Sequence, residues 1–192
     1  MDRDPLVIFN EIFSRASSIE GPLYNAAALA TVSGDSGPSL RMVLVKQADA
    51  RGFVFFTNLQ SRKARELAVN PLAALCFWWP RLASQVRVEG AVEPVDESDA
   101  DEYFASRPRE SQIGAWASRQ SEPVEAYEDL LRTAEEVSKR FANRTIPRPS
   151  HWSGLRVVPS SIEFWHERPG RLHERRLFVR TDGVWRSSLL QP

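Results

Sequence analysis

Residues 25–57 read NAAALATVSGDSGPSLRMVLVKQADARGFVFFT, three short apolar segments separated by two turns. The segments are residues 25–32, which are small and apolar, residues 41–46, which are rich in Val and Leu, and residues 53–57, which are largely aromatic. The turns carry the Gly, Pro, Asp and Ser that break regular structure, at residues 33–38 and 49–52. Apolar segments at hairpin distances favour antiparallel pairing over strand–helix–strand units. The stretch therefore predicts the start of an antiparallel sheet.

Further strands and several helices are predicted around this stretch. A helix is expected over residues 4–16, with Asp4 as its cap and Pro5 at the first helical position. Other helices are expected over residues 61–70, 96–107 and 123–141. Other strands are expected over residues 72–78, 84–92, 155–158, 161–165, 171–180 and 184–189. We expect the apolar stripe of the helix over 123–141 to pack in the core, while residues 111–118 fit no single pattern.

These elements predict one fold class. Six or more strands with helices inserted between them are typical of a closed or partly closed antiparallel barrel. No repeat or linker divides the sequence. We therefore expect a single domain over residues 1–192, α+β and mainly antiparallel.

The composition excludes several classes of protein. The 192 residues include 25 basic and 25 acidic side chains, so no global charge favours nucleic acid or an anionic membrane. The longest apolar run, residues 72–79, is far shorter than the ~20 residues of a membrane helix. The first residues lack a signal pattern, and Cys76, the only cysteine, excludes an intrachain disulfide. A cytoplasmic protein without nucleic-acid or membrane partners is predicted.

No metal site is expected. The three histidines, His151, His166 and His173, lack the companions of the known zinc motifs. Glycine-rich phosphate-binding motifs of the dinucleotide-binding and P-loop types are also absent from the sequence. Any phosphate site must therefore use another arrangement.

One basic cluster lies near the C-terminus, in Arg171-Leu172-His173-Glu174-Arg175. If this stretch is a strand, Arg171, His173 and Arg175 share one face, where they repel one another unless an anion lies among them. The alternative is a solvated edge strand whose charges block aggregation. His173 is the obvious candidate for acid–base chemistry at neutral pH.

A second basic cluster begins a predicted helix. Ser61 is a good N-cap, and the first helical turn presents unpaired N–H groups with partial positive charge. Arg62 and Lys63 are unfavourable in that turn unless an anion binds there; the alternative is that both reach into solvent. Two anion sites in one small chain suggest two phosphorylated ligands.

Two further pairs carry weaker signals. Tyr103 and Arg107 are four residues apart on one predicted helix, where they can hold a phosphate or form an ordinary surface pair. Arg41 and Lys46 bracket an apolar strand and are expected on its opposite faces. These two therefore serve different ligands, or one of them is solvated.

The chain resembles the pyridoxine/pyridoxamine 5′-phosphate oxidase family. The C-terminal signature of that family is an aliphatic residue followed by Glu-Phe/Tyr-Trp, a short spacer and Arg-Leu-His-Asp/Glu-Arg, which residues 162–165 and 171–175 match. Further matches are residues 41–46, 55–58, 61–64, 106–116 and 119–121. The resemblance runs in order over essentially residues 4–192.

The resemblance implies a split β-barrel that forms a homodimer, with FMN bound between the subunits. It also implies oxidation of pyridoxine or pyridoxamine 5′-phosphate to pyridoxal 5′-phosphate, by hydride transfer from C4′ to flavin N5 and reduction of O2 to H2O2. The implied FMN contacts are Arg41, Met42, Val43, Leu44, Val45, Lys46, Phe56, Thr57, Arg62, Lys63, Gln85, Gln120, Ser121, Trp165 and Arg175. The implied substrate contacts are Lys46, Tyr103, Arg107, Ser111, Arg171 and His173. Arg171 and His173 are expected to lie against the pyridine ring as catalytic residues.

The sequence departs from the family pattern in places. Family members usually carry an N-terminal basic segment that folds over the substrate, and this sequence starts after it, so the gene is short or closure works differently. Leu189 stands where an arginine is common, Glu174 where Asp is commoner, and Phe56 where many members have Tyr.

These departures leave two other functions open. One is a related flavin oxidase of aromatic secondary metabolism that acts on reduced phenazines. The other is a non-catalytic carrier of flavin or pyridoxal phosphate. The intact stretch over residues 106–116 favours a phosphorylated substrate, and retention of both Arg171 and His173 argues against a carrier.

Overall fold

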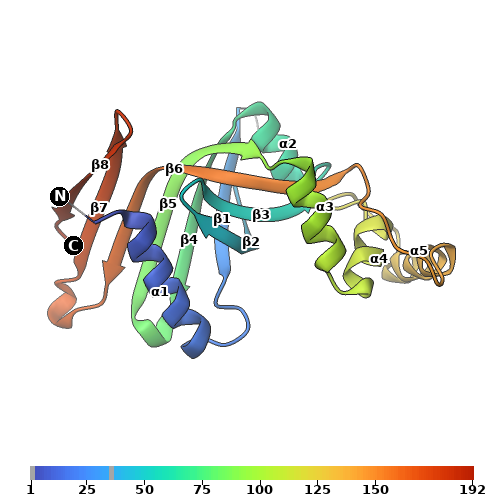
Figure 1. Ribbon diagram of the computed structural model, residues 1–192, viewed down its shortest axis with the longest axis horizontal. Helices are drawn as coiled ribbons and strands as arrows, with labels where there is room; N and C mark the ends of the chain where they lie inside the picture. The colour runs from blue at the N-terminus through green and yellow to red at the C-terminus, as the bar shows by residue number, and fades with distance from the viewer. Residues whose placement is uncertain (1–2, 35–36) are drawn as a thin grey trace.

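A computed structural model describes residues 3–34 and 37–192, and the described residues form one eight-stranded antiparallel sheet. The strands are β1 (Ala26–Ser33), β2 (Gly37–Asp49), β3 (Gly52–Asn58), β4 (Leu72–Trp79), β5 (Ser84–Pro94), β6 (Trp152–His166), β7 (Glu174–Thr181) and β8 (Val184–Leu190). Their order is β3-β2-β1-β4-β5-β6-β7-β8, and β3 also pairs with β6. This pairing closes β1–β6 into a barrel, while β7 and β8 extend the sheet beyond it (Figure 1). The predicted antiparallel barrel is confirmed.

The hairpins predicted from residues 25–57 form as expected. β1 and β2 pair from Ala26 with Leu44 to Ser33 with Gly37, and residues 35–36 of the predicted turn lie outside the described residues. β2 and β3 then pair as far as Asp49 with Gly52. Gly52 has a φ of +135° that a residue with a side chain rarely adopts. Turn residues and the apolar segments between them thus determine this half of the barrel.

The helices lie outside the barrel. They are α1 (Pro5–Ile19), α2 (Arg62–Val69), α3 (Glu97–Ser106), α4 (Arg109–Ala117) and α5 (Tyr127–Arg140), with short 3₁₀ turns η1 (Pro80–Leu82) and η2 (Pro169–Arg171). α1 begins as predicted, because the Asp4 side chain accepts a hydrogen bond from the Leu6 N–H at 2.8 Å. In Figure 1, α4 and α5 gather at the opposite end of the molecule from β7 and β8.

The main core lies inside the barrel and is covered by α1. Phe9 of α1 is fully buried, and its ring centroid lies 4.8 Å from that of Phe53 and 5.1 Å from that of Phe77. These rings meet at steep angles, the arrangement that aromatic quadrupoles favour. The core therefore fixes the barrel without using the polar side chains of the basic clusters.

The structure corrects several predicted elements. The two strands expected over 155–158 and 161–165 are one strand, β6, whose pairing with β5 shifts register between Glu89 and Gly90. Residues 111–118, which fitted no pattern, lie mostly in α4. The predicted core stripe is correct only toward the C-terminal end of α5, where Val137 and the buried Phe141 belong to the hydrophobic cluster of Phe104, while α5 itself packs on α4 at the periphery and contains no fully buried residue. Tyr127 and Leu131 are exposed.

The predicted strand over 171–180 begins late. Arg171 lies in η2 with a φ of +61°, directly after Gly170 with a φ of +67°, so the chain turns there. β7 begins only at Glu174. Arg171, His173 and Arg175 therefore do not share one strand face, because the alternation of a strand does not apply before residue 174.

Within the described ranges, no helix is long and apolar enough to cross a membrane.

Candidate active site

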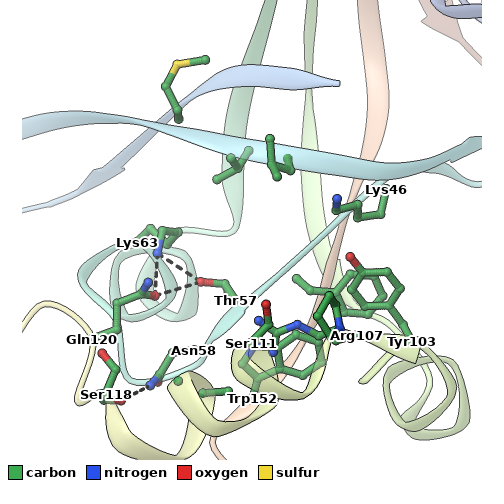
Figure 2. Close-up of a pocket in the computed structure, with 17 residues that line it drawn as sticks. Lys46, Thr57, Asn58, Lys63, Tyr103, Arg107, Ser111, Ser118, Gln120 and Trp152 are labelled. Atoms are coloured by element: carbon green, nitrogen blue, oxygen red, sulfur yellow. Dashed lines mark hydrogen bonds between the residues drawn. The ribbon is translucent and has the colours of Figure 1, made fainter. Parts of the chain in front are cut away.

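A cavity of about 650 Å³ opens between β2, β3 and α4 (Figure 2). Many of the residues predicted for the site line this cavity. The predicted residues that line it are Met42, Val43, Leu44, Lys46, Phe56, Thr57, Lys63, Tyr103, Arg107, Ser111 and Gln120. Side chains distant in sequence thus meet because the closed barrel brings β2 and β3 next to the helices that follow β5.

Lys63 forms one end of the cavity. Its side chain is only 9% exposed, and Nζ donates to Thr57 Oγ1 (3.0 Å), Ser61 Oγ (3.1 Å) and Gln120 Oε1 (3.0 Å). These acceptors are uncharged, so none of them neutralises the ammonium group. Burial, together with the nearby Arg41, lowers the pKa of Lys63 to about 8. Lys63 therefore does not reach into solvent, which was the alternative to an anion site, and the cavity end that it forms suits an anion.

Lys46, Tyr103, Arg107 and Ser111 lie together on the other side of the cavity (Figure 2). The Arg107 guanidinium carbon lies 4.7 Å from the Trp152 ring centroid, and burial lowers the pKa of Arg107. Arg107 Nη1 is buried and has no hydrogen-bond partner among the described residues. An unsatisfied cationic donor beside a lysine and two hydroxyl groups fits a phosphate group.

Aromatic rings form a wall at this second end. The Phe56 ring stacks on Tyr103 with centroids 3.9 Å apart and on Trp152 at 5.3 Å. Gly154 makes room for Phe56, because a Cβ there would lie 2.8 Å from the Phe56 ring. Burial raises the pKa of Tyr103, so its hydroxyl is a neutral hydrogen-bonding group at pH 7.

Two predicted arginines lie behind the Lys63 end and share one carboxylate, Glu66 of α2. Arg41 Nη2 lies 3.2 Å from Glu66 Oε2, and Arg62 Nε lies 2.8 Å from Glu66 Oε1. The Arg62 N–H donates to Ser121 Oγ at 3.1 Å, which places Ser121 at the start of α2. The sequence analysis missed Glu66, although its position four residues after Arg62 is the spacing of a helical ion pair.

The remaining predicted residues except Val45 form a second group, which lies on the face of β5, β6 and β7 that points away from the core and on the turn before β7. Trp165 pairs with Gln85 on β5 and with Arg175 on β7. The His173 ring centroid lies 4.5 Å from that of Trp165. Arg175 Nε donates to Glu163 Oε1 at 2.8 Å. This group is a surface with aromatic and cationic side chains, which lie next to one another because of the register in which β5, β6 and β7 pair.

Within one chain these two groups are separate. The cavity lies beside α3 and α4, whereas η2 and the start of β7 lie at the other end of the long axis in Figure 1. The predicted residues that do not line the cavity are Arg41, Val45, Arg62, Gln85, Ser121, Trp165, Arg171, His173 and Arg175. The Val45 side chain is fully buried in the core, so only its main chain can face a ligand.

The donor set of the cavity suits anions and not a metal. Its charged groups are Lys46, Lys63 and Arg107. No cluster of three or more potential metal ligands occurs among the residues that the structure describes. The cavity volume is in the range of small-molecule and cofactor sites.

Two family descriptions match consecutive parts of the chain. Residues 22–141 match the family described as pyridoxamine 5′-phosphate oxidase, and residues 152–192 match the pyridoxine 5′-phosphate oxidase C-terminal dimerisation region. A pyridoxine/pyridoxamine 5′-phosphate oxidase of Anaeromyxobacter dehalogenans is 54% identical over 189 residues, covering 98% of this chain and 96% of that protein. The protein of the same name from Rhodospirillum rubrum is 52% identical over 196 residues, covering 100% of this chain and 98% of that protein.

Solved structures share the fold. PhzG from Burkholderia lata, in complex with tetrahydrophenazine-1-carboxylic acid, superposes with a TM-score of 0.93 at 29% identity, over 100% of this chain and 94% of that one. A pyridoxamine 5′-phosphate oxidase-related, FMN-binding protein from Nostoc punctiforme gives a TM-score of 0.78 at 17% identity, over 100% of both chains. At that identity the second likeness concerns the fold alone.

Proposed function

Because the chain belongs to the pyridoxamine 5′-phosphate oxidase family, we propose that it oxidises pyridoxine or pyridoxamine 5′-phosphate to pyridoxal 5′-phosphate. The chain is an oxidoreductase of a family whose cofactor is FMN. The observation that supports this substrate class is the cavity with a cationic group at each end, Lys63 at one and Lys46 with Arg107 at the other. One end suits the phosphate of FMN and the other the phosphate of the substrate.

The residues present fit FMN. Lys63, Arg41 and Arg62 would hold its phosphate at the N-terminus of α2, where helical N–H groups and two guanidinium groups add to the ammonium charge. Thr57 and Gln120, which accept hydrogen bonds from Lys63, face the same space. The β2 main chain at Met42–Leu44 lines the path from this end toward Lys46.

The opposite end would bind the substrate phosphate. Arg107 carries the unsatisfied buried nitrogen, and Lys46, Tyr103 and Ser111 supply an ammonium and two hydroxyl groups. Trp152 holds the Arg107 guanidinium in place through a cation–π contact. This set therefore orients the substrate by its phosphate and leaves the pyridine ring directed toward the flavin end.

The chemistry that FMN supplies when bound is acceptance of a hydride from substrate C4′ and delivery of the electrons to O2, which gives H2O2. His173 would orient the C4′ hydroxyl or amine. Its Nδ1 accepts the Arg168 N–H at 3.3 Å, which leaves Nε2 as the protonated nitrogen of the neutral ring. His173 is therefore suited to donate a hydrogen bond to the C4′ substituent, and Arg171 lies on the same turn.

The composite site needs a second copy of the chain. His173, Trp165 and Arg175 lie far from the cavity of their own chain, and the region that carries them matches a dimerisation region. Leu40 and Met42 of β2 are exposed large apolar side chains beside that cavity. We therefore propose a homodimer in which each FMN contacts the cavity of one subunit and the His173 group of the other.

Mixing two inactive variants tests this arrangement. Lys63→Ala damages the cavity side and His173→Ala the other side, so each homodimer has no intact site. Unfolding and refolding the two together yields heterodimers with one intact site, and we expect about a quarter of wild-type turnover from an equal mixture. No recovery of activity would refute the shared site.

Turnover tests the reaction itself. The FMN-loaded protein is incubated in air with pyridoxine 5′-phosphate or pyridoxamine 5′-phosphate, and pyridoxal 5′-phosphate and H2O2 are measured together. Equal amounts of both products are expected. A protein that binds FMN and forms neither product would refute the proposal.

The structural match to PhzG at a TM-score of 0.93 favours one alternative, oxidation of a reduced phenazine. That substrate carries no phosphate, and Lys46, Arg107 and Ser111 would then have no phosphate to bind. Arg107→Ala discriminates between the two functions when the reduced phenazine carries no acidic group, because it should reduce turnover of a phosphorylated substrate and leave oxidation of that phenazine unchanged. A cytoplasmic location and action as one domain over residues 1–192 stay predictions, which cell fractionation and limited proteolysis would test.

A further inference from the structure

Glu66 lies behind the Lys63 end of the cavity, and it is almost completely buried. It is 4% exposed and lies in the second turn of α2. Its carboxylate accepts hydrogen bonds from Thr31 Oγ1 and Ser39 Oγ, both at 2.5 Å. The same carboxylate bonds Arg41 on β2 and Arg62 on α2. One side chain thus connects three elements of the proposed phosphate site.

The contacts divide the three cations into two kinds. Arg41 and Arg62 are both bonded to Glu66, whereas Lys63 donates only to uncharged oxygens. Arg41 also donates to Leu29 O at 3.2 Å and to the hydroxyl oxygens of Thr31 and Ser39, the two residues that donate to Glu66. The Arg62 side chain is 55% exposed, and among the described residues Glu66 is the only one that it bonds. Glu66 and its two hydroxyl donors, Thr31 and Ser39, therefore position Arg41, Glu66 positions Arg62, and Lys63 has no bond to Glu66.

The charge of the cluster also depends on Glu66. Three cations and one carboxylate leave two net positive charges, which match a phosphate monoester that carries about −1.5 to −2 at pH 7. Burial alone would raise the pKa of Glu66, but hydrogen bonds from Ser39, Thr31 and Arg62 lower it to about 2. The carboxylate is therefore ionised at every pH at which the protein is assayed.

We infer that Glu66 is a positioning residue that orients Arg41 and Arg62 toward the phosphate of the flavin and thereby sets the preference for FMN over riboflavin. This inference rests on the proposed binding of FMN at the N-terminus of α2. It concerns a residue that touches no ligand itself. Preorganised guanidinium groups lose less side-chain entropy on binding than free ones, which is the physical basis of the effect.

Neutralising Glu66 gives opposite results for the two roles that a buried carboxylate can have here. If Glu66 only offset positive charge, Glu66→Gln would tighten FMN binding, because a repulsive charge near the phosphate is removed. If Glu66 positions the arginines, Glu66→Gln weakens FMN binding, because charge-assisted hydrogen bonds to both guanidinium groups are lost. The direction of the change therefore distinguishes the roles.

The experiment measures dissociation constants of FMN and riboflavin by quenching of flavin fluorescence in the flavin-free full chain. Wild-type protein should bind FMN much more tightly than riboflavin. Glu66→Gln should weaken FMN binding about tenfold and leave riboflavin binding unchanged, as expected when hydrogen bonds to a charged partner are lost. Glu93→Gln is the matched control, because Glu93 also bonds an arginine, Arg156, and lies outside the proposed site.

Each of the other outcomes refutes either the positioning role of Glu66 or the proposed phosphate site. Unchanged or tighter FMN binding by Glu66→Gln refutes the positioning role, as does equal weakening of FMN and riboflavin, which would mean general structural damage. Wild-type protein that does not distinguish FMN from riboflavin would instead refute the proposed phosphate site, and this inference with it.

A milder variant covers the case in which Glu66→Gln does not fold. Ser39→Ala removes one donor to Glu66 together with one acceptor of the Arg41 guanidinium, and it leaves every charge in place. It should weaken FMN binding in the same selective way by a smaller factor, and the same affinity for FMN as in wild type would count against the inference.

Discussion

Raising the pH from 7 to 9 should weaken FMN binding about tenfold, because Lys63 loses its proton in that range. The pKa of Lys63 is about 8, lowered by burial and by Arg41, and its three hydrogen-bond acceptors are uncharged. A phosphate dianion bound beside Nζ stabilises the ammonium form, so the complex keeps the proton that the flavin-free protein gives up.

The magnitude follows from the fraction of protonated lysine. If only the ammonium form binds the phosphate, the dissociation constant rises by the factor 1 + 10^(pH − pKa), which changes from about 1.1 at pH 7 to about 11 at pH 9. The phosphate itself is a dianion throughout this range, since its second pKa is about 6. Each tenfold change corresponds to about 1.4 kcal/mol.

Fluorescence titrations at pH 7, 8 and 9 measure the effect, with calorimetry at pH 8 to detect the proton taken up on binding. Riboflavin, which has no phosphate, is the ligand control and should bind with the same affinity at all three values. Lys63→Arg is the protein control, because its charge does not titrate below pH 12. An FMN affinity that is the same at pH 7 and pH 9 in the wild type would refute the placement of the phosphate beside Lys63.

Three further changes test other parts of the structure. Gly154→Ala places a Cβ 2.8 Å from the Phe56 ring, so the ring must move. The Kd of pyridoxal 5′-phosphate, measured by an absorbance titration, should then rise several-fold, while the affinity for FMN should not change. Phe9→Ala removes a fully buried ring and should lower the free energy of unfolding by about 3–5 kcal/mol in denaturant titrations; a loss under 1 kcal/mol would contradict the packing. The pKa of Glu66, about 2 in the folded protein and ordinarily 4.5, gives stability that is present above pH 4.5 and lost as pH falls toward 2. Unfolding curves of Glu66→Gln should lack that part of the acid dependence.

Local signals were sufficient for the first half of the barrel. The turns at residues 33–38 and 49–52 and the apolar segments between them predict β1 and β3 within one residue at each end, whereas β2 runs from Gly37 to Asp49, well beyond the predicted residues 41–46. The closure of the barrel by β3 with β6 was not predictable in the same way. It joins Phe53 to Val157 across about half of the chain, and no local pattern specifies such a pairing.

The candidate site shows the same limit. Lys63 was identified because a lysine in the first turn of a helix is unfavourable without an anion, yet its burial depends on Thr57 and Gln120 from other elements. The alternation that put Arg171 on a strand face failed at Gly170, whose positive φ ends the regular backbone. Residue types thus predict the chemical class that a site binds, and tertiary contacts decide which of these residues lie together in the folded protein.

The length of β6 has a consequence for how this protein can evolve. Trp152 at its first residue lines the cavity, and Trp165 near its end belongs to the group around His173. One continuous strand of 15 residues therefore fixes the spacing of the two half-sites, roughly 45 Å along the backbone. Insertion or deletion of a single residue in it would reverse the faces of all side chains beyond that point. Substitutions are thus tolerated along β6 more readily than a change in its length, because in the proposed homodimer a length change would displace the group around His173 relative to the cavity of the partner subunit.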